Sequence, residues 1–171
     1  KSSASPGATD VGRVVEQALF LFQLRLRHDR VRVDNRCEPG RWTAWCDANR
    51  LEQVVVNLVG NALDAMRETE ERVLTLEAEQ RDASGTPVVA LRVRDTGKGL
   101  SETDLQRLFE PFYTTKPGGG GLGLGLAICR DLVAEFGGEL RAHNHPDGGA
   151  CFVLTVPVDP PADDPKESPS R

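Results

Sequence analysis

The segment from Asp47 to Met66 carries the pattern that most restricts the fold of this chain. When it is turned by about 100° per residue, as in an α-helix, its apolar side chains fall on one broad arc. They are Leu51, Val54, Val55, Leu58, Val59, Ala62, Leu63 and Met66. Asp47 is a residue type that favours the N-cap position. We therefore predict a long helix whose wide apolar face must be buried against other elements.

A narrow polar stripe follows one edge of that arc and consists of Arg50, Asn57, Asn61 and Asp64. A single Asn in such a stripe is usually part of a solvated helix face. Two of them at positions i and i+4 indicate another use, because Asn is a mediocre helix former. An amide oxygen can ligate a hard cation, and an amide nitrogen can donate to phosphate. Asn57 and Asn61 are therefore candidate ligands of Mg²⁺ beside a triphosphate.

Length and charge exclude several classes of function. With 171 residues, of which 39% are hydrophobic, the chain is long enough for one domain with a core. Its net charge of −5, with both signs interspersed, does not provide the basic face that nucleic-acid binding requires. It contains no apolar run of about eighteen residues, so we expect no direct membrane contact. Residues 1–10 lack the apolar centre of a secretion signal.

The four cysteines are scattered and form no Cys-x-x-Cys pair; they are Cys37, Cys46, Cys129 and Cys151. In a chain of this size we expect them to be reduced, buried and in a cytoplasmic setting.

The chain divides into one block with two polar flanks. We predict that residues 1–10 are a flexible linker stump, that 11–158 form one domain, and that 159–171 are a disordered tail, because both flanks are rich in Ser, Pro and charged residues. Helical spacing predicts helices over 14–26, 47–66, 101–108 and 124–136. Alternating patterns predict strands over 31–37, 42–46, 73–80, 88–94, 140–143 and 151–157. The predicted fold class is α/β (α+β), a two-layer sandwich with helices on one face of a mixed, largely antiparallel sheet.

Two glycine-bearing segments are candidate ligand-binding elements. Asp95, Gly97 and Gly99 follow a predicted strand directly, which suits close backbone approach by a ligand and one fixed hydrogen bond, although a plain turn would look the same. The second segment, 118–128, leads into a helix and alternates glycine with leucine from Gly121 to Leu126. Free N–H groups ahead of a helix bind anions. A flexible linker is the alternative, but the interleaved leucines favour packing, and no Walker-type Gly-Lys-Ser/Thr follows.

Residues 108–117 lie between these two segments and contain aromatic, threonine and lysine residues flanked by proline and glycine. We interpret them as a mobile lid that is anchored by Phe109 and Phe112, with Thr115 and Lys116 near the ligand and Lys116 able to reach a phosphate. An ordinary surface loop is the alternative.

The order of these motifs resembles the ATP-binding domain of sensor histidine kinases. Asn57 and Asn61 are similar to the N box, Asp95-x-Gly97-x-Gly99 to the first glycine box, Phe109-Glu110-Pro111-Phe112 to the F box, and Gly121 to Leu126 to the second glycine box. The resemblance covers nearly all of 11–158 and implies the GHKL group with its Bergerat-type fold. Among histidine kinases, the nitrogen-regulation and dicarboxylate-transport sensors look most similar.

This resemblance implies a site for ATP or ADP with Mg²⁺. Asp95 would accept a hydrogen bond from the adenine amine, with Gly97 and Gly99 beside it. Asn57 and Asn61 would hold Mg²⁺ against the phosphates. Phe112, Thr115 and Lys116 would lie on the lid. The phosphate end would be lined by Gly121, Leu122, Gly123, Leu124 and Gly125.

One residue departs from the family pattern. Many histidine kinases carry a basic residue at the position of Asp64, where it helps to neutralise phosphate. The sequence offers Arg50, Lys98 and Lys116 as replacements, and we favour Lys116.

The resemblance also separates a kinase from a hydrolase. Gyrase-type, heat-shock-90 and MutL ATPases place a glutamate general base four residues before the metal-binding Asn, whereas this chain has Asn57 there, which cannot accept a proton from water. His28, His143 and His145 lie outside any acceptor motif, and His143 and His145 lack further ligands for a metal pair. The resemblance therefore implies that Asn57, Asn61 and Lys116 assist transfer of the γ-phosphoryl of ATP to a histidine on an upstream dimerisation domain.

Further partners and rival functions follow from the same resemblance. The phosphorylated histidine would pass its phosphoryl group to the receiver domain of a response regulator, in the cytoplasmic part of a membrane-anchored sensor kinase. An anti-sigma-factor-type serine kinase, a GHKL ATPase and a non-catalytic nucleotide-binding docking module remain as alternatives.

Overall fold

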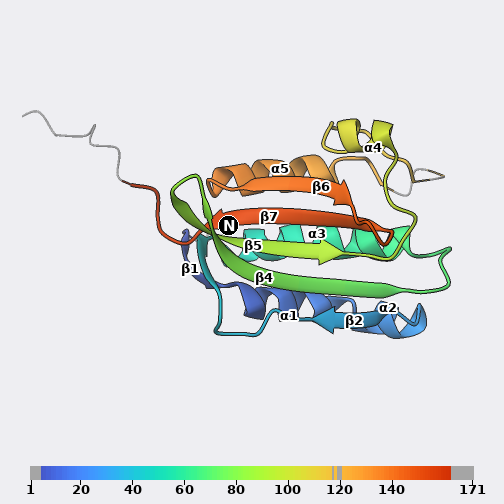
Figure 1. The fold of residues 1–171 in the computed structure, drawn as a ribbon, viewed down its shortest axis with the longest axis horizontal. Helices are drawn as coiled ribbons and strands as arrows, with labels where there is room; N and C mark the ends of the chain where they lie inside the picture. The colour runs from blue at the N-terminus through green and yellow to red at the C-terminus, as the bar shows by residue number, and fades with distance from the viewer. Residues whose placement is uncertain (1–4, 117, 119–120, 163–171) are drawn as a thin grey trace, which may run out of the picture.

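The protein is built as two layers, with helices covering one face of a five-stranded β-sheet (Figure 1). The computed structural model describes residues 5–116, 118 and 121–162. The strand order is β2-β4-β5-β7-β6. The bounds are Arg32–Asn35 (β2), Val73–Ala83 (β4), Thr86–Arg94 (β5), Glu139–Asn144 (β6) and Ala150–Pro157 (β7). Only β2 and β4 are parallel, and the other neighbours are antiparallel. The predicted mixed, largely antiparallel two-layer fold is confirmed.

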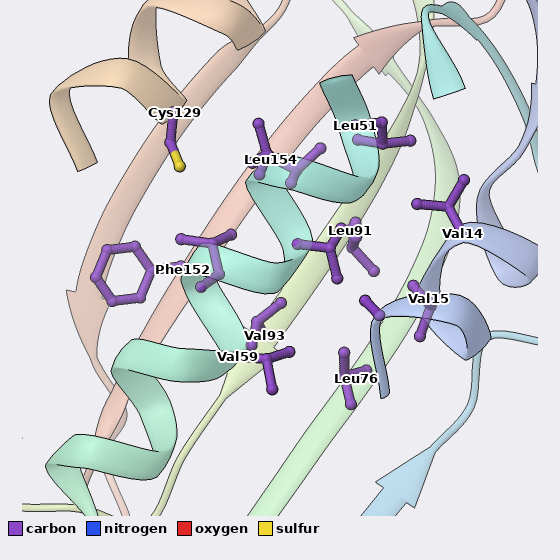
Figure 2. Close-up of a cluster of buried hydrophobic side chains, with 14 of the residues drawn as sticks. Val14, Val15, Leu51, Val59, Leu76, Leu91, Val93, Cys129, Phe152 and Leu154 are labelled. Atoms are coloured by element: carbon purple, nitrogen blue, oxygen red, sulfur yellow. The ribbon is translucent and has the colours of Figure 1, made fainter. Parts of the chain in front are cut away.

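Helix α3 (Ala48–Ala65) is the centre of the helical layer and lies between α1 (Val11–Leu21) and α5 (Gly125–Glu135). Asp47 caps it as predicted, because its Oδ1 accepts from the backbone N–H groups of Asn49 and Arg50 at 2.8 and 3.2 Å. The apolar arc of α3 is buried along its length, and its Leu51 belongs to the same buried cluster as Leu91 of β5 and Leu154 of β7 (Figure 2). The helix therefore holds its polar stripe fixed against a close-packed core.

The predicted helix over 14–26 is two helices, α1 and α2 (Gln23–His28), which are separated at Phe22. The backbone of Phe22 leaves the helical geometry, with φ −97° and ψ 3°. This break lets its ring pack over Gly60 of α3, where an added Cβ would lie 3.5 Å from the ring. The helical periodicity continues through Phe22, so it could not reveal the break.

The prediction that all of residues 1–10 form a flexible stump is wrong for their last part. Residues Gly7–Asp10 form β1, which pairs antiparallel with β3 (Thr43–Cys46) in a separate two-stranded sheet. The buried Thr9 donates through Oγ1 to the carbonyl of Cys46 at 2.8 Å. Asp10 caps α1 and also accepts from the N–H of Gly40 at 2.7 Å. These polar residues are used to make specific hydrogen bonds. The predicted tail continues past Ala162, outside the described residues.

The remaining elements agree with the predicted order. The β4–β5 hairpin is longer than predicted and closes at Ser84 and Gly85, which both have left-handed φ values of 55° and 86°. Helix α4 (Glu102–Arg107) begins with a capping box of Ser101 and Asp104. All four cysteines are buried and free, as expected. None of the helices in the described part of the chain has the length and apolarity to cross a membrane.

Candidate nucleotide-binding site

Asp95 lies just after the end of β5 and is buried, with 2% of its surface exposed. Its Oδ1 accepts from the backbone N–H of Gly97 at 2.8 Å and from that of Ala150 at 3.3 Å. Burial raises the pKa of the Asp95 carboxyl, and the two backbone hydrogen bonds oppose that rise. Both bonds go to Oδ1, so Oδ2 is the oxygen that remains for a ligand amine.

Glycines are required around Asp95 because other backbone segments approach closely. A Cβ on Gly97 would lie 2.5 Å from the carbonyl oxygen of Ala65, at the end of α3. A Cβ on Gly149 would lie 1.9 Å from the carbonyl oxygen of Asp95, and Gly149 also has a left-handed φ of 80°. The first glycine segment therefore packs directly on the C-terminal end of α3 and is held by the β6–β7 turn.

Asn57 faces the start of α5, and Asn61 lies beside it one turn further along α3. Nδ2 of Asn61 donates to Oδ1 of Asn57 at 3.2 Å. A Cβ on Gly125, the first residue of α5, would lie 2.4 Å from Nδ2 of Asn57. Only a glycine lets the N-terminus of α5 come this close to the amide stripe. The structure thus brings the N box and the second glycine box together.

Lys116 is the basic residue next to this pair. Its Nζ donates to Oδ1 of Asn61 at 3.3 Å and lies 2.6 Å from Oδ2 of Asp64. Of the other predicted replacements, Arg50 instead pairs with Glu135 at the last residue of α5. No described contact brings Lys98 to the asparagines.

Asp64 is the hub of a small charge cluster. Its Oδ1 accepts from Nη2 of Arg25 at 2.6 Å and lies 3.5 Å from Nη2 of Arg67. Burial on its own would raise the pKa of Asp64, but the hydrogen bonds from Lys116 and Arg25 outweigh it and hold that pKa below its ordinary value. The acidic residue that departs from the family pattern is therefore ionised and fully engaged by cations.

The predicted lid is anchored by only one of its two phenylalanines. Phe109 packs against the core, whereas Phe112 is 74% exposed and has a left-handed φ of 66°. The N–H of Phe112 donates to the carbonyl of Gly123 at 2.9 Å, so the backbone and not the ring holds this position. A further anchor is Tyr113, whose hydroxyl donates to Asp104 at 2.6 Å.

The other predicted site residues surround this segment. Thr115, Gly121 and Leu122 are exposed, whereas Gly123, Leu124 and Gly125 are half-buried. Gly123 has φ 69°, and a Cβ there would lie 2.6 Å from the carbonyl oxygen of Tyr113. The F box and the second glycine box therefore touch through backbone atoms, as their neighbouring places in the sequence suggest.

Two supporting residues escaped the sequence analysis. Thr96 donates through Oγ1 to the carbonyl of Glu71 at 2.8 Å and accepts from the N–H of Val73 at 2.9 Å. Asn144 accepts from the N–H of Leu100 at 2.8 Å and donates to the same residue's carbonyl at 2.7 Å. Both fix the first glycine segment. In the sequence, each of them is only a polar residue beside a turn, and many solvated residues have the same position.

The donor set suits Mg²⁺ held together with phosphate oxygens and water. The described residues contain no cluster of three or more His, Cys, Asp or Glu that could form a metal cage. Two amide oxygens from adjacent turns of α3 are hard ligands of the kind that Mg²⁺ accepts. Oδ1 of Asn61 accepts from Lys116 here, so Lys116 must move aside for that oxygen to face a cation.

Comparison with known proteins supports the class that fold and site define. Residues 46–160 match the family described as histidine kinase-, DNA gyrase B-, and HSP90-like ATPases. The chain belongs to this family. Within it, the chain is an ATPase domain of the kind found in two-component sensor histidine kinases, as the following relatives indicate.

One relative is the C4-dicarboxylate transport sensor protein DctB of Rhizobium meliloti, which is 37% identical over 90% of this chain and 24% of its own length. Another is the two-component sensor PprA of Pseudomonas aeruginosa, which is 39% identical over 86% of this chain and 16% of its own length. The chain therefore spans a quarter or less of each of these two relatives.

Solved structures give the same result. The catalytic domain of histidine kinase ThkA superposes with a TM-score of 0.76 and 26% identity, covering 91% of this chain and 97% of that domain. Full-length ShkA in complex with AMPPNP superposes with a TM-score of 0.74 and 29% identity, covering 94% of this chain and 32% of that chain. The fold is that of histidine kinase catalytic domains.

Proposed function

We propose that this domain binds Mg·ATP and transfers the γ-phosphoryl group to a histidine on a separate helical dimerisation domain of the same kinase, for relay to a response regulator. The observation that carries the proposal is the convergence at the start of α5. There a half-buried amide pair, a lysine and the free end of a helix meet, while Asp95 offers a carboxylate oxygen beside α3.

Each residue has a role that its position supports. Asp95 accepts a hydrogen bond from the adenine amine through Oδ2, since its Oδ1 is occupied. The N-terminus of α5, with the backbone of Gly121 and Gly123, donates to phosphate oxygens. Asn57 and Asn61 hold Mg²⁺, which would offset the negative charge of the phosphates. Lys116 turns from Asp64 to the transferring phosphoryl group.

The same residues favour transfer to a protein over hydrolysis. Asn57 donates and accepts hydrogen bonds but takes no proton at neutral pH, so it cannot activate water. A neutral imidazole needs no such activation, because its nitrogen is already nucleophilic. Of the chain's own histidines, His143 and His145 lie on the β6–β7 hairpin and line the other face of the sheet from the helices. His28 ends α2, and none of the three histidines lies in an acceptor motif, so we assign the acceptor to another domain.

The partners follow from the relatives and are part of the proposal. In the ThkA complex with the response regulator TrrA, the kinase superposes on 91% of this chain with a TM-score of 0.71 and 26% identity. We place this domain in the cytoplasmic part of its parent protein, where ATP is available.

The experiment adds a dimeric helical hairpin that bears the acceptor histidine to this domain, with γ-labelled ATP. The domain alone should show neither protein-bound label nor brisk phosphate release, because positioning without a nucleophile transfers nothing. The hairpin should acquire label that acid removes. A variant hairpin in which Gln replaces the histidine is the control.

Other outcomes would favour the alternatives. Acid-stable label on a protein substrate would favour a serine kinase. Brisk phosphate release by the domain alone, persisting in Glu52→Ala and Glu110→Ala, would favour an ATPase. Absence of any nucleotide binding would leave a docking module. The sensor-kinase names of the relatives favour the histidine kinase over all three.

A further inference from the structure

The face of the sheet that the helices leave open carries a hollow of about 350 Å³. The buried Leu76, Val93 and Phe152 face the helices (Figure 2). Because side chains alternate along a strand, their neighbours in the sequence face the other way. One row across the open face consists of Thr75, Arg94, Cys151 and His143, which are register partners on four adjacent strands. This row forms the floor of the hollow.

The lining of this hollow is cationic. Three guanidinium groups, those of Arg36, Arg92 and Arg94, share it with one carboxylate, that of Glu77. Burial raises the pKa of the Cys151 thiol, so that group stays neutral and adds no negative charge. Three guanidinium groups and one carboxylate give the lining residues themselves a formal charge of +2, in a chain whose net charge is −5.

Two of the three arginines are matched by carboxylates outside the floor row. Nη2 of Arg36 lies 2.6 Å from Asp34, and Nη2 of Arg92 lies 2.5 Å from Glu79. Nη1 of each of these two arginines also lies 3.5 Å from a carboxylate oxygen of Glu77. These pairs fix the rim and leave little capacity for a ligand.

Arg94 is different. Its Nε is buried and has no hydrogen-bond partner among the described residues. The closest described carboxylate to Arg94 is that of Asp147, whose side chain is 81% exposed. Its Oδ2 lies 3.9 Å from Nη2 of Arg94, which is beyond hydrogen-bonding distance. A buried donor without a partner costs free energy, so native structures seldom leave one unmatched. Since 28% of the Arg94 side chain is exposed while Nε itself is covered, a ligand in the hollow would satisfy Nε once the guanidinium turns toward it.

We propose that this hollow is a binding site for the phosphate or carboxylate group of a small molecule, centred on Arg94. The edge of a guanidinium formed by Nε and Nη2 presents two parallel N–H groups that match two oxygens of one such group. His143 and His145 at the β6–β7 end offer further hydrogen bonds. The volume suits a small ligand.

The site is next to the nucleotide-binding residues along the chain but opens on the other face. Arg94 directly precedes Asp95, and Cys151 directly follows Ala150, whose N–H bonds Asp95. A ligand on Arg94 would therefore contact the same two strand ends that hold the adenine-binding carboxylate.

The test follows the Nε–H signal of Arg94 by NMR while inorganic phosphate is added to the domain that has first been saturated with Mg·ADP. Malonate is titrated in a second arm, and sodium chloride of equal ionic strength is the reference. Saturable shifts of Arg94 and of the Cys151 and His143 amides are expected. The anion that binds more tightly shows whether the site prefers a phosphate or a carboxylate group. Shifts that never saturate, or that sodium chloride reproduces, would overturn the proposal.

Variants sharpen this test. Arg94→Gln should weaken anion binding about tenfold or more, as expected for one charge-assisted pair. Arg141→Gln removes the same charge from the same face but outside the hollow, where Arg141 pairs only with Glu139 among the described residues, and it should leave affinity unchanged. Equal losses in both variants would mean general charge attraction. If Arg94→Gln does not fold, the titration of the parent protein decides.

Discussion

Lys116 and Asp64 join the lid to helix α3, with Nζ of the lysine 2.6 Å from Oδ2 of the aspartate. Asp64 occupies the position where many histidine kinases carry a basic residue. The lysine that we expect to replace that residue is thus held by the aspartate itself. Without nucleotide the pair keeps the lysine beside Asn61, and with nucleotide it must open for Lys116 to reach a phosphate.

The first prediction is that Asp64→Asn tightens Mg·ATP binding. The change removes a negative charge near the phosphates and frees Lys116, so we expect an increase in affinity of about twofold to fivefold, the range of one partly exposed ion pair. Calorimetric titration measures it. Asp29→Asn is the matched control, because Asp29 pairs with Arg25 as Asp64 does but does not touch Lys116. Unchanged or weaker binding in Asp64→Asn would contradict the prediction.

The second prediction concerns acid. The pKa of Asp64 is held below its ordinary value of 3.8, so its ion pairs stabilise the fold fully above that value and are lost as pH falls through the lower folded pKa. The difference in unfolding free energy between the parent and Asp64→Asn should therefore be largest near neutral pH and shrink in acid. Denaturant unfolding at pH 7 and pH 3 tests this. A difference that grows in acid would exclude it.

The third prediction is that Asp95→Asn stabilises the domain but disables nucleotide binding. Because burial raises the pKa of Asp95, its ionised form destabilises the fold at neutral pH, and that penalty disappears as pH falls through the folded pKa. An Asn can still accept from Gly97 and Ala150 through one oxygen. We expect a higher melting temperature, with roughly tenfold to hundredfold weaker ATP binding.

The control for this prediction is Asp131→Asn, which removes the charge of an exposed carboxylate on α5. It should change neither quantity. If Asp95→Asn lowers the melting temperature, the carboxylate stabilises the free domain, and the inference that its burial destabilises the fold is wrong.

The fourth prediction is that nucleotide slows hydrogen exchange in the lid. The sequence of residues 109–121 is rich in glycine and proline, a composition that gives a segment little preference for regular structure. A non-hydrolysable ATP analogue should slow exchange there, while the β4–β5 hairpin serves as an internal reference. Equal exchange in the lid with and without the analogue would remove the idea of a closing lid.

The local patterns were sufficient to predict α3 and its polar stripe. The 3.6-residue period of its apolar residues reflects burial along its whole length, and Asn57 and Asn61 meet because i and i+4 share a face. The glycine segments were also identifiable, since Gly97 and Gly125 stand where another backbone or side chain approaches too closely for a Cβ.

The features that the sequence could not predict depend on contacts between residues that are far apart along the chain. Thr9 bonds Cys46, 37 residues away, so β1 looked like part of a polar flank. Gly149 packs against the backbone carbonyl of Asp95, but in the sequence it is only one more glycine in a hairpin turn. Phe112 is exposed although phenylalanine favours burial, and its position is held by a backbone hydrogen bond to Gly123. Such contacts are set by tertiary packing, which local propensity does not encode.

The fifth prediction is that Gly125→Ala weakens Mg·ATP binding without unfolding the domain. Alanine is a better helix former than glycine by about 1 kcal/mol, so α5 itself loses nothing. Its Cβ, however, would lie 2.4 Å from Nδ2 of Asn57 and must displace that amide. We expect affinity to fall about tenfold or more, with the melting temperature nearly unchanged. Gly60→Ala is the control on α3, because its Cβ would make only an ordinary 3.5 Å contact with Phe22. Equal affinities for the two variants would show that Asn57 takes no part in binding.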